Sequence, residues 1–394
     1  MDAAADWADS GLAYLTGLPD AQPDFSRAAV LAEARRVCAD IARLIGVDVD
    51  AATVLAGRAA ILGLTRRGHV SAGGATWLLP TADGWCAVAL PRADDIAALP
   101  ALLETDDVPA DAWSALSSWA ATRSTDAVLD RTRLLDIAAA GLGEVSAAPP
   151  AVERAGSSAE PRPVDGLLVA DLSSLWAGPL SAQLLARAGA VVVKVESPSR
   201  PDGTRAGEPA FYDWMNFGKL SYAIDFDDDI EALRQLLAAA DVVIEGSRPA
   251  ALRRRGLSAD DIPARRGRVW LRVSGYAGQP DRPAFGDDAA VAGGLVGADA
   301  EGPVFCGDAI ADPLSGLAAA RALGESLRRG GGEVIEVSMA QVAAQYAALP
   351  TAPSAGDAPV ARPQAPPLNP SASPLGADNI AVRHIVSERL CESC

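Results

Sequence analysis

The sequence predicts an α/β fold, in which the strands of a parallel sheet alternate with helices. The main observation is the stretch from Leu167 to Glu196, where two apolar runs flank a Gly178-Pro179 turn and a segment with helical spacing. This order is typical of one βαβ unit. A second observation is that 49% of the 394 residues are hydrophobic. The chain is therefore long and apolar enough for two domains and a sizeable core.

The charge and cysteine content exclude several classes of protein. A net charge of −17 and a pI near 4.6 argue against binding to nucleic acid or to an anionic membrane. Five cysteines are too few for a disulfide framework. The first ten residues carry three acids where a signal peptide carries basic residues, and no apolar run reaches the ~18 residues of a membrane span. We therefore expect a soluble cytoplasmic protein.

Residues 1–145 are expected to form a smaller α+β region. Residues 27–46 have the apolar spacing of a helix, and residues 115–142 return to helical spacing. Between them, residues 74–90 have the alternation of two strands around an Asp83-Gly84 turn.

The remaining boundaries follow from composition. Residues 146–163 are rich in Pro, Ala and Ser and are expected to form a linker. Residues 164–347 alternate strand and helix patterns, as in a large α/β domain. Residues 348–373 are rich in proline and predict an extended arm, and residues 374–394 predict a final helix. No G-x-G-x-x-G motif follows the first strand of the large domain, so a dinucleotide site is not expected.

The large domain carries a series of motifs in fixed order. They are the AGP turn with its KVE strand at residues 177–196, NFGKLSYAIDF at 216–226, ADVVIEGSRP at 240–249, VSGYAGQP at 273–280, IADPLSG at 310–316 and VIEVSMA at 334–340. This series resembles the class III CoA-transferases of the CaiB/BaiF type, a family that also contains α-methylacyl-CoA racemases. The resemblance implies a Rossmann-like parallel-sheet large domain.

The resemblance also implies a smaller α+β domain built from both chain ends. The DGW hairpin at residues 83–85 is similar to family material that normally follows the V-S-M strand, whereas PLGADN at 374–379 still lies near the end of the chain. The domain order therefore looks permuted. The family forms interlocked homodimers, and the Pro-rich arm is compatible with one.

Asp312 is the candidate catalytic residue. It falls where the transferases carry the carboxylate that attacks an acyl-CoA thioester, and such a carboxylate splits acyl transfer into two easier steps through an anhydride. The alternative is that Asp312 is an ordinary helix N-cap, with Pro313 at the first helical position. Asp308, four residues earlier, is the second candidate for the nucleophile.

Asp287 stands where the racemases have a histidine that moves the α-proton. An aspartate could act as a base there, but two carboxylates in one site would repel an enolate. The alternative interpretation is that Asp287 and Asp288 form a solvated pair at the start of a helix.

The resemblance implies coenzyme A as the bound cosubstrate, and no metal. Pro179 is expected at the first position of a helix whose N–H groups suit an anion, and Arg200 and Arg205 could pair with phosphates. The expected CoA-binding residues are Trp176, Ala177, Gly178, Pro179, Arg200, Arg205, Lys219, Gly246 and Arg248. Several positions depart from the family pattern, namely Ser197, Gly246, Ser247 and Ala277, which puts the CoA pocket in doubt.

Three functions are therefore compatible with the sequence. The first is transfer of CoA between an acyl-CoA and a carboxylic acid, the second is racemase or related acyl-CoA chemistry, and the third is a non-catalytic binding subunit. The two histidines, His69 and His384, match no motif, and the C-terminal CESC is one pair without a second, which is weak support for a metal site.

Overall fold

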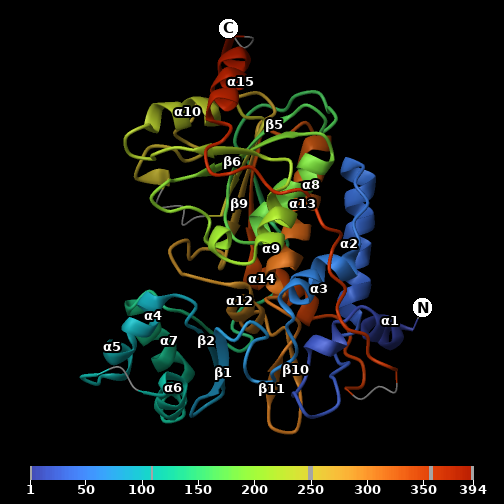
Figure 1. The fold of residues 1–394 in the computed structure, drawn as a ribbon, viewed down its shortest axis with the longest axis vertical. Helices are drawn as coiled ribbons and strands as arrows, with labels where there is room; N and C mark the ends of the chain where they lie inside the picture. The colour runs from blue at the N-terminus through green and yellow to red at the C-terminus, as the bar shows by residue number, and fades with distance from the viewer. Residues whose placement is uncertain (1, 108–109, 247–251, 355–357, 392–394) are drawn as a thin grey trace.

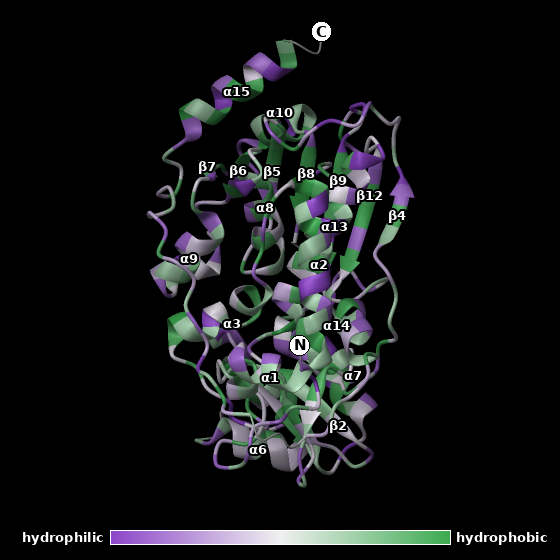
Figure 2. Cartoon of the chain, turned by 90° about the vertical axis from the view of Figure 1, so that its right-hand side faces the viewer, coloured by the Kyte–Doolittle hydropathy of each residue, from purple (hydrophilic) through white to green (hydrophobic). Residues whose placement is uncertain are grey.

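The computed structural model describes residues 2–107, 110–246, 252–354 and 358–391. A seven-stranded sheet forms the centre of the molecule, in the order β4-β12-β9-β8-β5-β6-β7 (Figure 2). Every neighbouring pair is parallel except β4 with β12, which is antiparallel. The expected parallel α/β fold is confirmed. The strands are β4 (Ala151–Arg154), β5 (Leu168–Leu172), β6 (Val191–Glu196), β7 (Leu220–Ala223), β8 (Val242–Glu245), β9 (Val269–Ser274) and β12 (Glu333–Ser338).

Alternate residues of the strands point to opposite faces of the sheet and pack into two separate hydrophobic cores. Val169 packs with α8 (Ala177–Arg187) and α13 (Ala311–Arg328) on one face of the sheet. Leu168 packs with α10 (Ile230–Ala239) on the other face. Both faces are apolar because both are covered, which explains why the strands lack an alternation of apolar and polar residues.

The N-terminal helices belong to the large core. They are α1 (Ala3–Asp9), α2 (Ala29–Ile45) and α3 (Ala51–Leu62). Trp7, Leu31 and Leu55 are fully buried in the same cluster as α8 and α13, and α2 runs alongside these two helices (Figure 1). The expectation that residues 1–145 form one separate region is therefore wrong for this first part.

A small lobe follows from the hairpin onward. The hairpin expected around Asp83-Gly84 is present, with Thr81 N donating to Gly84 O at 2.9 Å. Its elements are β1 (Thr76–Pro80), β2 (Trp85–Ala89), β3 (Ala138–Gly141), α4 (Ala93–Ala97), α5 (Leu99–Leu103), α6 (Ala112–Ala120) and α7 (Thr125–Leu134). This lobe has its own core, and it lies at the opposite end of the molecule from the C-terminus (Figure 1).

The segment expected to be a linker, residues 146–163, contains an edge strand. β4 pairs with β12 from Glu333↔Arg154 to Glu336↔Ala151, although all four of its residues are exposed. An exposed strand with a single apolar valine has no sequence pattern of its own, and its pairing is set by the partner strand.

The Pro-rich arm runs along its own chain. Ala352 N donates to Ser26 O at 3.1 Å, Ala361 N to Ala8 O at 3.0 Å, and Ala372 N to the Asp213 carboxylate at 2.8 Å. The arm thus crosses the N-terminal helices and α9 on its way back to the sheet.

The C-terminal helix α15 (Asn379–Cys391) does not complete the small lobe. Val382 and Val386 are buried against α10 and the sheet, and the Asn379 side chain pairs with the edge strand β7 through both the N–H and the carbonyl of Ala223. The expectation of a small domain assembled from both chain ends is therefore corrected: α15 packs against α10 and the edge strand β7, at the end of the molecule opposite the small lobe (Figure 1).

The other described elements connect these parts. They are η1 (Ala13–Leu15), η2 (Gly203–Ala206), α9 (Pro209–Asn216), α12 (Gly286–Ala292), β10 (Val296–Ala298), β11 (Pro303–Phe305) and α14 (Met339–Ala347). Within the described ranges, none of the helices combines the length and the apolar character needed to cross a membrane.

Candidate active site

Asp312 lies in the first turn of α13, which starts at Ala311. Ile310 is the N-cap residue and its side chain makes no capping hydrogen bond, while Asp312 and Pro313 occupy the second and third helical positions. The alternative that Asp312 caps the helix, with Pro313 at its first position, is therefore wrong. The helix dipole still favours a negative charge here, although Asp312 N already donates to Ala309 O and Pro313 has no N–H.

A glycine lets the next helix approach Asp312 closely. A Cβ built on Gly286, the first residue of α12, would lie 2.4 Å from Asp312 Oδ2 and 2.3 Å from Ala309 O. The Gly286 N–H hydrogen-bonds the Asp312 carboxylate. Ala309 itself has a φ of +43°, a left-handed conformation that costs a non-glycine residue about 1 kcal/mol. The loop before α13 is therefore held in a strained form at this site.

Three aspartates and one arginine gather here, and we call Asp287, Asp308, Asp312 and Arg58 the carboxylate cluster. Burial raises the pKa of Asp312 to about 7; the charge of Arg58 opposes this shift and the two other aspartates reinforce it. Burial and then the charge of Asp308 raise the pKa of Asp287 to about 6. Asp287 Oδ1 also accepts from Ala309 N at 3.0 Å, which ties its helix to the strained loop.

The interpretation of Asp287 and Asp288 as a solvated pair is wrong. Asp288 is fully buried, where it accepts from Phe285 N at 2.7 Å and from the Tyr276 hydroxyl at 3.2 Å. Burial raises the pKa of Asp288 to about 7. Asp288 is thus the capping carboxylate of α12, and Asp287, on the preceding helical position, is half-buried in the cluster.

Arg58, from α3, is the residue that sequence reasoning missed. Its Nη1 lies 2.7 and 2.8 Å from the two carboxylate oxygens of Asp308, which is 1% exposed. Its guanidinium carbon also lies 5.5 Å from the ring centroids of both Trp176 and Phe211. The one available signal was an arginine within an otherwise small and apolar helix, AATVLAGRAAIL.

Both lysines of the chain are buried inside a second set of charges, which we call the lysine cluster: Lys194, Lys219, Asp171 and Asp202. Lys219 Nζ donates to Asp171 at 2.9 Å, to Pro179 O at 3.0 Å and to the Asn216 side chain at 3.1 Å. An ammonium has three protons, so no donor of Lys219 is left for a phosphate. This geometry argues against the expected CoA contact of Lys219.

The lysine cluster fixes the turn that leads into α8. Lys194 binds Asp202 at 2.8 Å and also donates to Ser173 O, and the Asp202 carboxylate accepts from Leu175 N at 3.2 Å. Leu175 has a φ of +70°, so the turn needs such support. In this structure both lysines therefore support the turn that positions Trp176.

Trp176 and the glycines expected to bind CoA are packing residues in this structure. Trp176 is 3% exposed and α8 begins at Ala177, which puts Pro179 at the third helical position instead of the first. A Cβ on Gly178 would lie 2.2 Å from the Ser173 Cβ, and one on Gly246 would lie 3.1 Å from it. Both glycines thus make room for Ser173.

Of the two arginines expected to pair with phosphates, Arg205 already forms an ion pair within the protein and Arg200 is exposed. Arg205 makes a two-pronged ion pair with Glu196, at 2.6 and 2.8 Å, and stacks over the Tyr212 ring at 4.4 Å. Arg200 is exposed beyond the end of β6. Arg248 and Ser247 lie outside the described residues.

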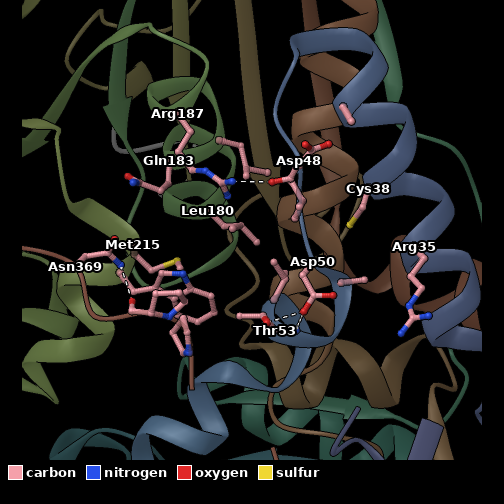
Figure 3. Close-up of a pocket in the computed structure, with 18 of the residues that line it drawn as sticks. Arg35, Cys38, Asp48, Asp50, Thr53, Leu180, Gln183, Arg187, Met215 and Asn369 are labelled. Carbon is pink, nitrogen blue, oxygen red and sulfur yellow. Dashed lines mark hydrogen bonds between the residues drawn. The ribbon is translucent and has the colours of Figure 1, made fainter. Parts of the chain in front are cut away.

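A cavity of about 840 Å³ lies between α2, α3, α8, α9 and the arm (Figure 3). Among the residues that the structure describes, none of those expected for catalysis or CoA binding lines it. A row of aromatic rings connects the cavity to the carboxylate cluster: Trp176 and Phe211 are 5.4 Å apart, and Phe211 is 6.3 Å from Trp214, which lines the cavity.

The fold and the cluster together define an α/β protein with an acid group of raised pKa at the start of a buried helix. Residues 164–377 match the family model CoA-transferase family III, and the chain belongs to this family. The family resemblance of the motifs is therefore confirmed.

Several curated proteins are similar to about half of the chain. A succinyl-CoA–D-citramalate CoA-transferase of Chloroflexus aurantiacus is 31% identical over 204 residues, which are 46% of this chain and 50% of the relative. A succinate–glutarate CoA-transferase of Agrobacterium fabrum is 30% identical over 207 residues, 46% of this chain and 52% of the relative. The chain thus spans about half the length of the curated relatives that it matches.

Solved structures overlap the chain over a similar share. A CAIB/BAIF family protein of Brucella suis is 28% identical with a TM-score of 0.42, over 47% of this chain and 55% of that one. A hypothetical protein of Mycobacterium tuberculosis is 30% identical with a TM-score of 0.41, over 48% of this chain and 56% of that one.

Proposed function

We propose that this protein transfers coenzyme A between an acyl-CoA thioester and a carboxylic acid, with Asp312 as the nucleophile. The observation that carries the proposal is the half-buried Asp312 carboxylate, which lies in the first turn of α13 beside Arg58 and has a pKa of about 7. At neutral pH a substantial fraction of such a group is ionised, and its raised pKa makes it a stronger nucleophile than an exposed aspartate.

The proposed reaction proceeds through anhydrides and one enzyme-bound thioester. The Asp312 carboxylate attacks the thioester carbon and expels CoA thiolate, which leaves a mixed anhydride. The thiolate then attacks the Asp312 carbonyl carbon and releases the donor acid as a carboxylate. The acceptor carboxylate attacks the new aspartyl thioester, and the thiolate finally attacks the acceptor's carbonyl carbon. The acceptor leaves as its CoA thioester, and Asp312 is restored without net gain or loss of protons.

Asp312 is a better candidate than Asp308 on structural grounds. Asp308 is buried and binds Arg58 through both oxygens, so an attack would have to break that pair. Asp312 is partly exposed, and it accepts from the Gly286 N–H. The Gly286 N–H could stabilise the oxyanion that forms during acyl transfer.

Racemase chemistry is a weaker candidate because of the cluster's charge. Asp287 would have to remove an α-proton beside two other carboxylates, and the enolate formed would be repelled by them. CoA transfer needs no enolate. Its negative charges lie on the carboxylates that enter and leave, and these are close to the positive charge of Arg58.

The proposed acids are small carboxylates, because relatives named for succinate, glutarate and D-citramalate match the same half of the chain. We also propose that CoA lies across the carboxyl ends of β5, β6 and β8, where Arg200 is exposed and could meet a phosphate. Binding would then depend on local cations despite the net charge of −17.

The proposal is tested by trapping the activated aspartate. The protein is incubated with a panel of acyl-CoAs and hydroxylamine, and peptide mass spectrometry locates the resulting hydroxamate. We expect a label on Asp312 and none in Asp312→Asn. A label confined to Asp308 would reject the assignment, and no CoA binding by calorimetry would favour a non-catalytic role.

A homodimer in the cytoplasm completes the proposal. Family resemblance supports the dimer, and the uncovered edge strand β4 offers a surface at which a second copy could pack. Light scattering during size-exclusion chromatography would give twice the mass of 40.3 kDa, and a stable monomer would contradict the dimer.

A further inference from the structure

Arg58 reaches the carboxylate cluster from outside the part of the chain that matches the family model. It stands in the middle of α3, whereas the family match covers residues 164–377. Its contacts nevertheless go to residues of that matched part, namely Asp308, Trp176 and Phe211. The N-terminal segment thus supplies the cation of a site whose acids come from the family domain.

The guanidinium of Arg58 keeps part of its donor capacity unused. Only Nη1 bonds to Asp308; among the described residues, neither Nε nor Nη2 of Arg58 has a hydrogen-bond partner. The side chain is 25% exposed, so these nitrogens are not sealed in the core. The ion pair with Asp308 and the two aromatic rings hold the group in place, which lowers the entropy lost when it binds a ligand.

The other cations near the site are already occupied. All three donors of Lys219 are used, Lys194 is buried against Asp202 and Ser173 O, and Arg205 is committed to Glu196. A carboxylate that enters the cluster meets three aspartates, so its binding requires a cation with free donors. Arg58 has them.

We propose that Arg58 is the recognition residue for the carboxylate of the acid substrate, which its free Nε and Nη2 edge would hold beside Asp312. A guanidinium edge with two N–H donors matches a carboxylate in a two-pronged geometry. Asp308 acts through Arg58 as a positioning residue. This inference deepens the proposed transferase function and rests on it for the identity of the reaction, but the binding step can be measured without turnover.

The first experiment measures binding alone. Ligand-observed NMR titrations of the full chain, with and without CoA, compare succinate with succinamide, its neutral diamide. We expect the wild type to prefer succinate, and Arg58→Gln to bind it at least about tenfold more weakly. Arg58→Lys, which keeps the charge but loses the planar fork, should be intermediate.

Arg321→Gln is the matched control. Arg321 has a similar exposure of 22%, and its weak ion pair with Asp40, at 3.8 Å, likewise connects the N-terminal helices to the family domain. Succinate binding should not change in this variant. Equal loss in Arg321→Gln and Arg58→Gln, equal affinity for succinate and succinamide, or no succinate binding by the wild type would each overturn the inference.

The second experiment separates this inference from the proposed function. Acyl-CoA alone is used to label Asp312 with hydroxylamine at about pH 9, where a group with a pKa of about 7 is ionised. Absence of label in the wild type rejects the transferase mechanism, while the NMR titration still decides the role of Arg58. With label present, Arg58→Gln should keep it and raise the KM for the acid by about tenfold or more. An unchanged KM would overturn the inference, and melting curves exclude unfolding as the cause.

Discussion

The molecule contains two clusters of buried charge that differ in how their charges are balanced. In the lysine cluster, two ammonium groups face two aspartates, and all three donors of Lys219 are used. The charges of Lys219 and Lys194 outweigh the effect of burial, so the pKa of Asp171 lies below its usual value. Burial lowers the pKa of Lys219 to about 8 against the charge of Asp171, so most of its ammonium is still charged at neutral pH. A cluster whose opposite charges are paired in this way is suited to fixing a turn.

The carboxylate cluster is unbalanced in the opposite sense. Three aspartates share one guanidinium, and the pKa values of Asp312 and Asp287 are raised to about 7 and about 6. These groups change charge near neutral pH, as catalytic acids and nucleophiles do. The comparison teaches that the presence of buried charge does not mark a reactive site, whereas an excess of one sign together with open donors does.

The largest expected effect is on turnover. Asp312→Asn removes the proposed nucleophile while keeping the size of the side chain, so CoA transfer should fall at least about a thousandfold. Steady-state transfer between an acyl-CoA and an acid measures it. Asp202→Asn, in the lysine cluster, provides the contrast. The fraction of this variant that folds should still transfer CoA. Full activity of Asp312→Asn with an unchanged melting curve would remove Asp312 from the mechanism.

The second effect is on stability and concerns the lysine cluster. Lys219→Met leaves Asp171 buried without its partner and should lower the free energy of unfolding by about 3 to 5 kcal/mol. Adding Asp171→Asn should recover part of this loss, since both charges are then gone. Urea unfolding measures both variants. A stable Lys219→Met that binds CoA more weakly would instead return Lys219 to the phosphate site.

The fold class and the family could be predicted from the sequence, because each depends on residues close together along the chain. The βαβ unit and the Asp-Gly hairpin are local patterns of hydrophobicity and turn chemistry. The packing of α15 could not be predicted in this way, since its contacts with α10 lie about 150 residues away in the chain. β4 was missed because its exposed residues carry no alternation.

The site was only partly predictable for the same physical reason. Arg58 and Asp308 are 250 residues apart, and no motif links them. The two lysines lay in the expected motifs, but sequence alone could not distinguish a lysine that meets a phosphate from one buried against Asp171 or Asp202. The pairing of each charge depends on which chain segments the fold brings together.

The third effect is on the pH dependence of the reaction. In the proposed mechanism Asp312 attacks only when ionised, so the rate of its acylation should fall about tenfold per pH unit below its pKa of about 7. Because the charge of Arg58 lowers this pKa, Arg58→Gln should move the midpoint to higher pH. Hydroxamate formation measured from about pH 5 to about pH 9 checks both statements. If hydroxamate formation did not change with pH, the ionisation of Asp312 would not control the rate of acylation.

The smallest expected effect is on the pH dependence of folding stability, and it has opposite signs in the two clusters. Asp312 has a folded pKa of about 7, above the value of about 3.9 in an unfolded chain, so its protonated form stabilises the fold. That stability is present below about pH 4 and is lost as the pH rises through 7. Asp312→Asn, which cannot ionise, should therefore be more stable than the wild type by about 1 to 3 kcal/mol at about pH 8 and equal to it at about pH 4.

Asp202 should behave in the reverse way. Burial would raise its pKa, but the charge of Lys194 and hydrogen bonds from Lys194 and Thr204 lower it to about 2. Its stabilising contribution is therefore present above about pH 4 and is lost as the pH falls through 2. Asp202→Asn should be less stable than the wild type at about pH 8, and the difference should shrink in acid. Urea unfolding of both variants across this range tests the comparison directly: if Asp312→Asn and Asp202→Asn shift stability in the same direction at pH 8, the two clusters do not differ in charge balance.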